Sequence, residues 1–268
     1  MSTVISRDGT AIAFEHVGSG PPLILVDGAL CSRAFGPMPK LAPLLAQSFR
    51  VYLYDRRGRG ASADTKPYAK EREVEDLDAL IGEAGGSAFV LGLSSGAGLA
   101  LEAAASGLAI DKLAVYEPPY MVSPADSERH ARADHEAQLV RLIAADRRGD
   151  AVKYFMRDMV GVPAFFVFMM RFMPGVWSKL EAAASTLPYD AAIMANFSLP
   201  AQRLGTIRTP TLVIGGGKSE ARLRAAVEAA AKAIPNARLR TLPGQTHNVK
   251  PEALTPVVTE FFAHLTRE

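Results

Sequence analysis

A serine stands between glycines where an apolar run meets a helical pattern. The stretch "GLSSG" (92–96) matches G-x-S-x-G, follows the run 87–93 and opens an alanine-rich helix predicted over 95–106. A tight strand-to-helix turn strains its central residue and projects the side chain above the sheet, and small flanking residues let strand and helix approach. The positive helix end favours negative charge that develops there. The pattern predicts Ser94 as a nucleophile; a glycine-rich turn without chemistry is the alternative.

A serine hydroxyl needs a neighbouring base, and histidine suits this role with an ordinary pKa of about 6.5. His247 follows the last predicted strand in "LPGQTHNVK", on a loop that Gly244 helps to turn. We expect the other histidines on solvated faces: His16 in the first hairpin, His130 and His135 in a charged stretch, and His264 in the final helix. His247 is therefore the candidate base.

The elements that must position these residues alternate along the chain. Near-continuous apolar runs, typical of strands covered on both faces, lie at 22–27, 50–55, 87–93, 112–117, 210–216 and 237–243. Helical patterns lie at about 36–48, 71–84, 95–106, 219–233 and 252–266. A hairpin is expected at the start of the chain, around "RDG". This alternation predicts an α/β protein with crossover units around a parallel sheet.

The stretch "YDRRGRGASAD" (54–64) resembles the D-x-R-G-x-G-x-S loop of the α/β-hydrolase family. With the serine turn and the late histidine, the resemblance covers nearly the whole chain apart from 118–205. It implies a mostly parallel eight-stranded sheet flanked by helices, with a core of 1–117 and 206–268 and a helical cap at 118–205. Within the loop, Asp55 is expected to accept backbone hydrogen bonds, whereas Arg56, Arg57 and Arg59 are expected to be solvated or structural.

The acid is where this sequence departs from the family pattern. The resemblance implies the chain order serine, acid, histidine. Family members commonly place an aspartate where this chain has Ser219, and Glu220 is displaced by one residue. Glu117 ends the preceding strand, an arrangement that resembles haloalkane dehalogenases with a glutamate at that point. We expect Glu117 to orient the histidine, with Glu220 or a serine–histidine dyad as alternatives.

Acyl transfer also needs donors aimed at a developing oxyanion, and the resemblance implies the backbone amides of Ser95 and Ala29. Family members often carry His-Gly in the second loop, whereas this chain has Asp27 and Gly28. An ionised Asp27 would oppose the reaction, so it must face away, pair with a cation such as Arg33, or be protonated. Nearby Cys31 is expected to be an apolar filler.

The predicted cap is rich in large apolar side chains, which we expect to pack the cap and, in part, to line a substrate pocket. They are Phe155, Met156, Met159, Phe165, Phe166, Phe168, Met169, Phe172, Met173 and Trp177. The segment 162–177 is interrupted by Arg171 and is shorter than the roughly 20 residues that span a bilayer. We expect this segment to be buried or to line a cavity, and the chain to have no membrane partner.

Composition excludes several function classes. The net charge is +2, with basic and acidic residues interspersed, so no nucleic-acid partner is expected. One cysteine and no basic-then-apolar leader favour a cytoplasmic protein. No metal, nucleotide or other cofactor motif is present, and "GGGKS" (215–219) has the wrong spacing for a phosphate loop.

These features predict a serine hydrolase that cleaves an ester, lactone or thioester of a small-to-medium apolar substrate through an acyl-enzyme on Ser94. One alternative keeps the fold but changes the reaction, to a cofactor-free lyase, a C–C hydrolase or a peroxidase-like enzyme. Another is a ligand-binding sensor with little or no turnover. The chain is expected to be a monomer or a homodimer.

Overall fold

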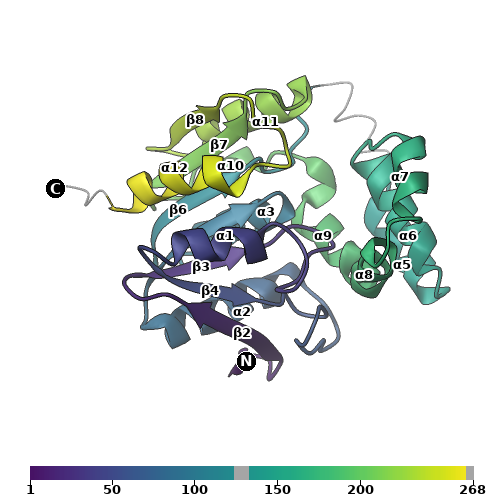
Figure 1. The fold of residues 1–268 in the computed structure, drawn as a ribbon, viewed down its shortest axis with the longest axis horizontal. Coiled ribbons are helices and arrows are strands. Elements are labelled where there is room, and N and C mark those ends of the chain that lie inside the picture. The colour runs from purple at the N-terminus through teal and green to yellow at the C-terminus, as the bar shows by residue number, and fades with distance from the viewer. Residues whose placement is uncertain (124–132, 264–268) are drawn as a thin grey trace.

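One mixed sheet forms the centre of the protein (Figure 1). The computed structural model describes residues 1–123 and 133–263. The eight strands lie in the order β1-β2-β4-β3-β5-β6-β7-β8. Pairing is antiparallel for β1–β2 and β2–β4 and parallel for all other neighbours. The strands are β1 (Ser2–Ile5), β2 (Ala11–Val17), β3 (Pro22–Val26), β4 (Arg50–Tyr54), β5 (Ala88–Leu93), β6 (Ile110–Tyr116), β7 (Thr211–Gly216) and β8 (Arg238–Leu242). This confirms the predicted eight-stranded, mostly parallel sheet.

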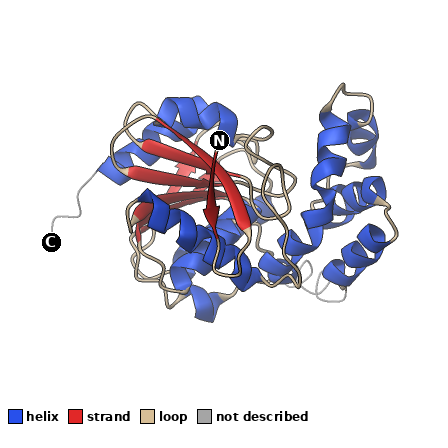
Figure 2. Ribbon diagram, turned by 90° about the horizontal axis from the view of Figure 1, so that it is seen from below, coloured by secondary structure: helices blue, strands red, loops and turns tan. Residues whose placement is uncertain are grey.

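The strand sequences are apolar on both faces because helices cover both sides of the sheet (Figure 2). In β3, Ile24 and Val26 point into one core, with side chains of α2, α3 and α11. The alternate residues Leu23 and Leu25 point into the other core, with α1 and α12. These helices are α1 (Met38–Leu45), α2 (Lys70–Ala84), α3 (Ser95–Ala105), α11 (Ala221–Ala233) and α12 (Pro251–Ala263).

A helical insertion separates β6 from β7. It has its own core, which contains Leu139, Val152 and Leu187. Figure 1 shows α5 to α8 beside the sheet, with α9 between them and α3, and α9 packs against both α5 and α3. The elements are α5 (His135–Ala144), α6 (Arg148–Tyr154), the π-helix η1 (Phe155–Met159), α7 (Ala164–Met170), α8 (Val176–Ala183), the 3-10 helices η2 (Ala184–Thr186) and η3 (Ala195–Phe197), α9 (Leu187–Ile193) and α10 (Ala201–Leu204).

The expectation that the segment 162–177 is buried or lines a cavity is met only in part: four of its residues line a pocket, but most of its large apolar side chains are exposed. Val167 and Trp177 are buried, but Phe165 and Phe172 are each 66% exposed. Phe166, Phe168, Met169 and Met173 are exposed as well. The short α7 offers only one side to the insertion's core, and its sequence is apolar on all sides, so most of these side chains face outward. Among the described residues, no helix is long and apolar enough to cross a membrane.

A central and an edge strand of the sheet give a direct test of where the core lies. Leu25 in the central strand β3 is 1% exposed, whereas Leu239 in the edge strand β8 is 48% exposed. Leu25→Ala should lower the free energy of unfolding by about 2–5 kcal/mol, because it removes packed atoms and leaves a cavity. The matched Leu239→Ala change should cost less than about 1 kcal/mol. Urea denaturation of both variants measures the difference, and equal losses would contradict the described core.

Candidate active site

Ser94 lies at a strained turn where β5 passes into α3. Its backbone has φ 54° and ψ −123°, a conformation that L residues rarely adopt, and α3 begins at the next residue. The Ser94 amide donates to the carbonyl of Tyr116 on the neighbouring strand, at 2.9 Å. A Cβ on Gly92 would lie 2.5 Å from the Gly96 carbonyl oxygen, so the turn requires a glycine at that position. The geometry is the strained strand-to-helix turn that the sequence predicts.

Glu117 and His247 meet next to this turn. Leu93 and Tyr116 are register partners in the parallel pair β5–β6, so Ser94 and Glu117 leave the same edge of the sheet side by side. His247 comes from the loop after β8, and its Nδ1 lies 2.8 Å from Glu117 Oε2. The imidazole is partly exposed, whereas the carboxylate is fully buried. Glu117 and His247 are therefore in direct contact, and Ser94 follows the strand beside the one that Glu117 follows.

The Glu117 carboxylate is held by two further contacts. Its Oε1 accepts from the Gly216 amide at 2.7 Å and from the Ser219 hydroxyl at 2.5 Å. Burial raises the pKa of this carboxyl, but the hydrogen bonds from His247, Ser219 and Gly216 outweigh burial and hold the pKa below its ordinary value. Glu117 is thus a carboxylate with a fixed orientation toward the imidazole.

The structure also places Ser219, at the usual position of the aspartate, and Glu220, the alternative acid. Ser219, where family members commonly have the aspartate, donates to Glu117. Glu220 is exposed and its Oε2 lies 2.6 Å from Arg222 Nε. Its side chain is thus engaged with α11. No pattern in the sequence indicates that Ser219 supports the glutamate that follows the neighbouring strand.

The expectation that the other histidines are solvated is wrong for His135. This side chain is buried, and its Nδ1 lies 2.8 Å from the Tyr154 hydroxyl within the insertion. His16 is exposed on β2, as expected. His130 and His264 lie outside the described residues.

The loop after β3 lies against the serine turn. A Cβ on Gly28 would lie 3.3 Å from Ser94 Cβ, which places the amide of Ala29 in the neighbourhood of the hydroxyl. Asp27 is buried, and its Oδ1 accepts from the Gly28 amide at 2.9 Å. Burial raises the pKa of Asp27 to about 7, although the Gly28 hydrogen bond and the Arg59 charge work in the opposite direction. Asp27 is therefore neutral below a pH of about 7 and ionised above it.

Arg33 does not pair with Asp27. Its Nε lies 3.1 Å from Asp55 Oδ2 and its Nη1 lies 3.2 Å from Glu15. Asp55 also accepts from the backbone amides of Arg33 and Ala61, as expected for a carboxylate at the end of a strand.

Cys31 lies beside Asp27 in the same loop. Burial and the neighbouring Asp27 charge raise the pKa of the thiol well above its ordinary value. A protonated thiol is a weak nucleophile, in agreement with a packing role. Within residues 1–123 and 133–263, no group of three or more His, Cys, Asp or Glu side chains is arranged to hold a metal ion.

The three arginines after β4 are buried and ion-paired, which fits the structural and not the solvated alternative of the prediction. Arg56 makes a two-pronged pair with Glu73 on α2, at 2.6 and 2.9 Å. Arg57 makes a similar pair with Asp76, at 2.8 and 2.6 Å. Arg59 Nη2 lies 2.7 Å from Asp190 Oδ2, on α9 of the insertion.

Sequence analysis missed Asp190. It is fully buried, and its Oδ1 lies 2.9 Å from Arg56 Nη1 and accepts from the Ser95 hydroxyl at 2.8 Å. Three charged arginines in eleven residues are a signal that buried carboxylates must exist elsewhere, but the sequence does not say which of the 28 acidic residues supply them.

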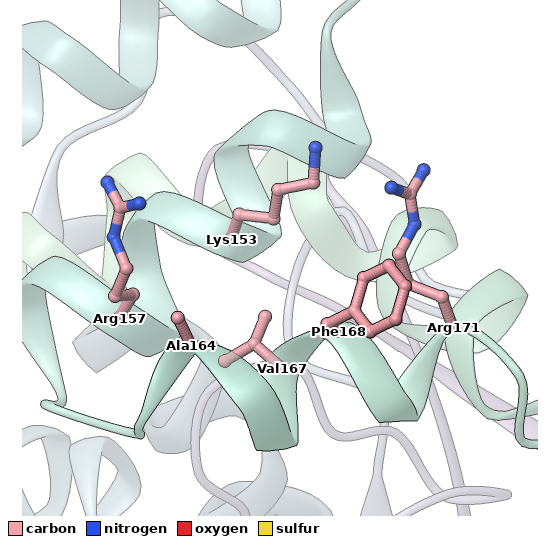
Figure 3. Close-up of a pocket in the computed structure, with 6 residues that line it drawn as sticks. All are labelled: Lys153, Arg157, Ala164, Val167, Phe168 and Arg171. Atoms are coloured by element: carbon pink, nitrogen blue, oxygen red, sulfur yellow. The ribbon is translucent and has the colours of Figure 1, made fainter.

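A pocket of about 210 Å³ lies away from these residues, between α6, η1 and α7 (Figure 3). Lys153, Arg157 and Arg171 extend to one side of it, and apolar side chains of α7 form its other wall. Lys153 is paired with Asp150, and Arg157 with Asp158. The pocket shares no lining residue with the serine turn.

The model of the alpha/beta hydrolase family matches residues 18–255. The crystal structure of an alpha/beta hydrolase from Sphaerobacter thermophilus is 53% identical, with a TM-score of 0.88, over 98% of this chain and 100% of that chain.

Two curated mycobacterial relatives match less closely. BpoC of Mycobacterium tuberculosis, a candidate non-heme bromoperoxidase, is 25% identical over 94% of this chain and 97% of its own length. "Probable oxidoreductase EphD" of the same organism is 41% identical over 85 residues, which are 30% of this chain but 14% of that protein. The family match and the Sphaerobacter structure both cover most of the fold and the serine turn. This chain therefore belongs to the alpha/beta hydrolase family.

Proposed function

We propose that the protein is a serine hydrolase that cleaves an ester, lactone or thioester of a small-to-medium apolar substrate. The observation that carries this proposal is the placement of Ser94 at a strained turn beside the Glu117–His247 pair. A hydrolase needs a nucleophile, a base and a group that orients the base, and these three side chains supply that set at one edge of the sheet. The helical insertion is proposed to act as a cap over this edge.

In the proposed reaction, His247 takes the Ser94 proton while the serine oxygen bonds to the acyl carbon. The imidazolium then gives that proton to the departing alcohol, leaving an acyl-enzyme. Water, deprotonated by His247, attacks the acyl carbon, and the acid leaves as Ser94 recovers its proton. The amides of Ala29 and Ser95 are proposed to bind the oxyanion in both halves.

Glu117 is proposed to orient the imidazole and to stabilise its cation. Its Oε2 holds Nδ1, which leaves Nε2 as the nitrogen available to the serine. The Ser219 hydroxyl and the Gly216 amide fix the carboxylate from its other side, which replaces the rigidity that an aspartate on the β7 loop would give.

Ser94→Ala tests the nucleophile. Stopped-flow measurement with p-nitrophenyl butyrate should show a burst of nitrophenol stoichiometric with the wild-type enzyme and no burst in the variant, because acylation needs the Ser94 oxygen. Ser178→Ala, an exposed serine on α8, is the matched control and should keep the burst. An equal burst in Ser94→Ala would refute the assignment.

Paired substitutions test the acid. Glu117→Gln keeps the shape of the side chain but removes the charge that orients and stabilises the imidazolium, so kcat should fall on the order of 10³-fold or more. Glu220→Gln, whose side chain is engaged with Arg222, should change kcat less than twofold. Steady-state kinetics on the same ester measure both. The reverse ranking would make Glu220 the acid.

The pKa of Asp27 predicts a pH dependence. The carboxyl is neutral below its pKa of about 7 and negative above it, and a negative charge beside the oxyanion amides opposes the transition state. The value of kcat/KM should therefore fall about tenfold as pH rises from 6.5 to 9. Asp27→Asn should abolish that fall, whereas Asp111→Asn, at an exposed position, should retain it.

Folding stability gives an independent check of the same group. Between pH 4 and 7 the folded protein holds a proton on Asp27 that the unfolded chain releases, so the free energy of unfolding decreases as pH rises through this window. In Asp27→Asn, the free energy of unfolding measured by urea denaturation should lack this part of the decrease between pH 4 and 7. If Asp27→Asn keeps both the wild-type fall in kcat/KM at alkaline pH and the wild-type dependence of stability on pH, Asp27 is ionised over the whole range from pH 4 to 9.

Peroxidase-like chemistry is the second candidate, and the similarity to BpoC over nearly the whole chain is the observation that favours it. The same stopped-flow experiment separates the two. Bromination of a cyclic diketone with hydrogen peroxide and bromide, without a nitrophenol burst, would favour this candidate.

A further inference from the structure

A fully buried carboxylate of the helical insertion contacts the serine turn. Asp190, on α9, accepts from the Ser95 hydroxyl at 2.8 Å. Arg56 Nη1 and Arg59 Nη2 lie 2.9 and 2.7 Å from the two oxygens of the same carboxylate. The two arginine charges outweigh burial and hold the pKa of Asp190 below its ordinary value. One ionised side chain therefore joins the insertion, the β4–α2 loop and the residue that follows Ser94.

The same two arginines donate hydrogen bonds to the loop after β3, which carries Ala29, the other proposed oxyanion donor. Arg59 Nη1 donates to the Gly28 carbonyl at 2.6 Å, and Arg56 Nη1 donates to the Asp27 carbonyl at 3.3 Å. The Gly28 carbonyl and the Ala29 amide belong to one planar trans peptide, so they point in opposite directions. A guanidinium that fixes the carbonyl also fixes the direction of the Ala29 N–H.

We propose that Asp190 is a positioning residue that aims both amide donors of the oxyanion site. It holds Ser95 directly, through the hydroxyl, and it holds Ala29 through the arginines that bind the carbonyls of its loop. The inference rests on the proposed function, since the oxyanion role of these amides is part of it. Asp190 lies far from Ser94 in the sequence and belongs to the insertion. Neither fact would lead one to expect that it positions residues at the nucleophile turn.

Charge and geometry predict opposite effects at Asp190. The network contains two cations, Arg56 and Arg59, and two anions, Asp190 and Glu73. Removing one anion leaves an excess positive charge near the site, which by electrostatics alone would stabilise an oxyanion and raise the rate. Loss of positioning would lower the rate. The sign of the change therefore separates the two.

The experiment compares three variants by the acylation rate of p-nitrophenyl butyrate in single-turnover conditions. Asp190→Asn should lower this rate on the order of 10- to 100-fold with KM within about threefold, because a misaimed donor acts in the transition state. Ser95→Ala keeps the amide and all charges but removes the hydroxyl contact, and should lower the rate about 3- to 10-fold. Tyr189→Phe is the matched control: its hydroxyl bonds Asp64 from the same helix and should leave the rate unchanged.

A second readout reports on geometry without turnover. In ¹⁵N–¹H spectra, the Ala29 and Ser95 amide signals should shift in Asp190→Asn and remain in place in Tyr189→Phe. A trifluoromethyl ketone, which forms an oxyanion adduct on Ser94, should lose affinity in proportion to the acylation rate, whereas the product acid should bind as in the wild type.

Each outcome decides the proposal. A folded Asp190→Asn variant with an unchanged or increased acylation rate and unshifted amides overturns it, while loss of the burst in Ser94→Ala leaves the hydrolase function standing. If Asp190→Asn does not fold, Ser95→Ala decides: a rate equal to wild type overturns the proposal. If Ser94→Ala keeps its burst, the hydrolase function fails, and the amide shifts alone then support or refute the positioning of the loop.

Discussion

Three guanidinium groups lie inside this protein without access to water, and each must meet a carboxylate. An unpaired buried charge costs several kcal/mol, so the loop after β4 can adopt its position only if its partners arrive from elsewhere in the chain. Asp76 comes from α2, Asp8 from the first hairpin turn, and Asp190 from α9. The requirement fixes the hairpin, α2 and the insertion around one end of β4, next to the serine turn. Organisation of the site is thus a consequence of charge compensation as much as of apolar packing.

The serine turn imposes a second, purely steric constraint. Holding Ser94 at φ 54° costs about 1–3 kcal/mol, which persists only because the surrounding elements over-determine the turn. Gly96 lies so close to the carbonyls of Val26 and Asp27 that any side chain would collide with them. This contact brings β3 and its following loop against the start of α3. The same close approach that strains Ser94 therefore sets the Ala29 amide beside it.

Local periodicity explains what could be predicted. Strands, flanking helices, the serine turn and the loop of His247 are written in short apolar runs and glycine positions, and all appear where the sequence places them. The predictions that failed concern contacts between residues far apart in the chain. The pairing of Arg33 with Asp55, and of Arg59 with Asp190, is a matter of three-dimensional distance that spacing does not encode. Apolar composition in 162–177 likewise indicates a helix but not which of its sides is covered.

Buried ion pairs anchor α9 of the insertion to the loop after β4. Opening the insertion at α9 would separate Asp190 from Arg56 and Arg59, and of these three only Arg56 would keep an ionic partner among the described residues, Glu73. Such a step costs several kcal/mol, and each 1.36 kcal/mol slows it tenfold. The ion pairs of Asp190 with Arg56 and Arg59 therefore hold α9 against the serine turn.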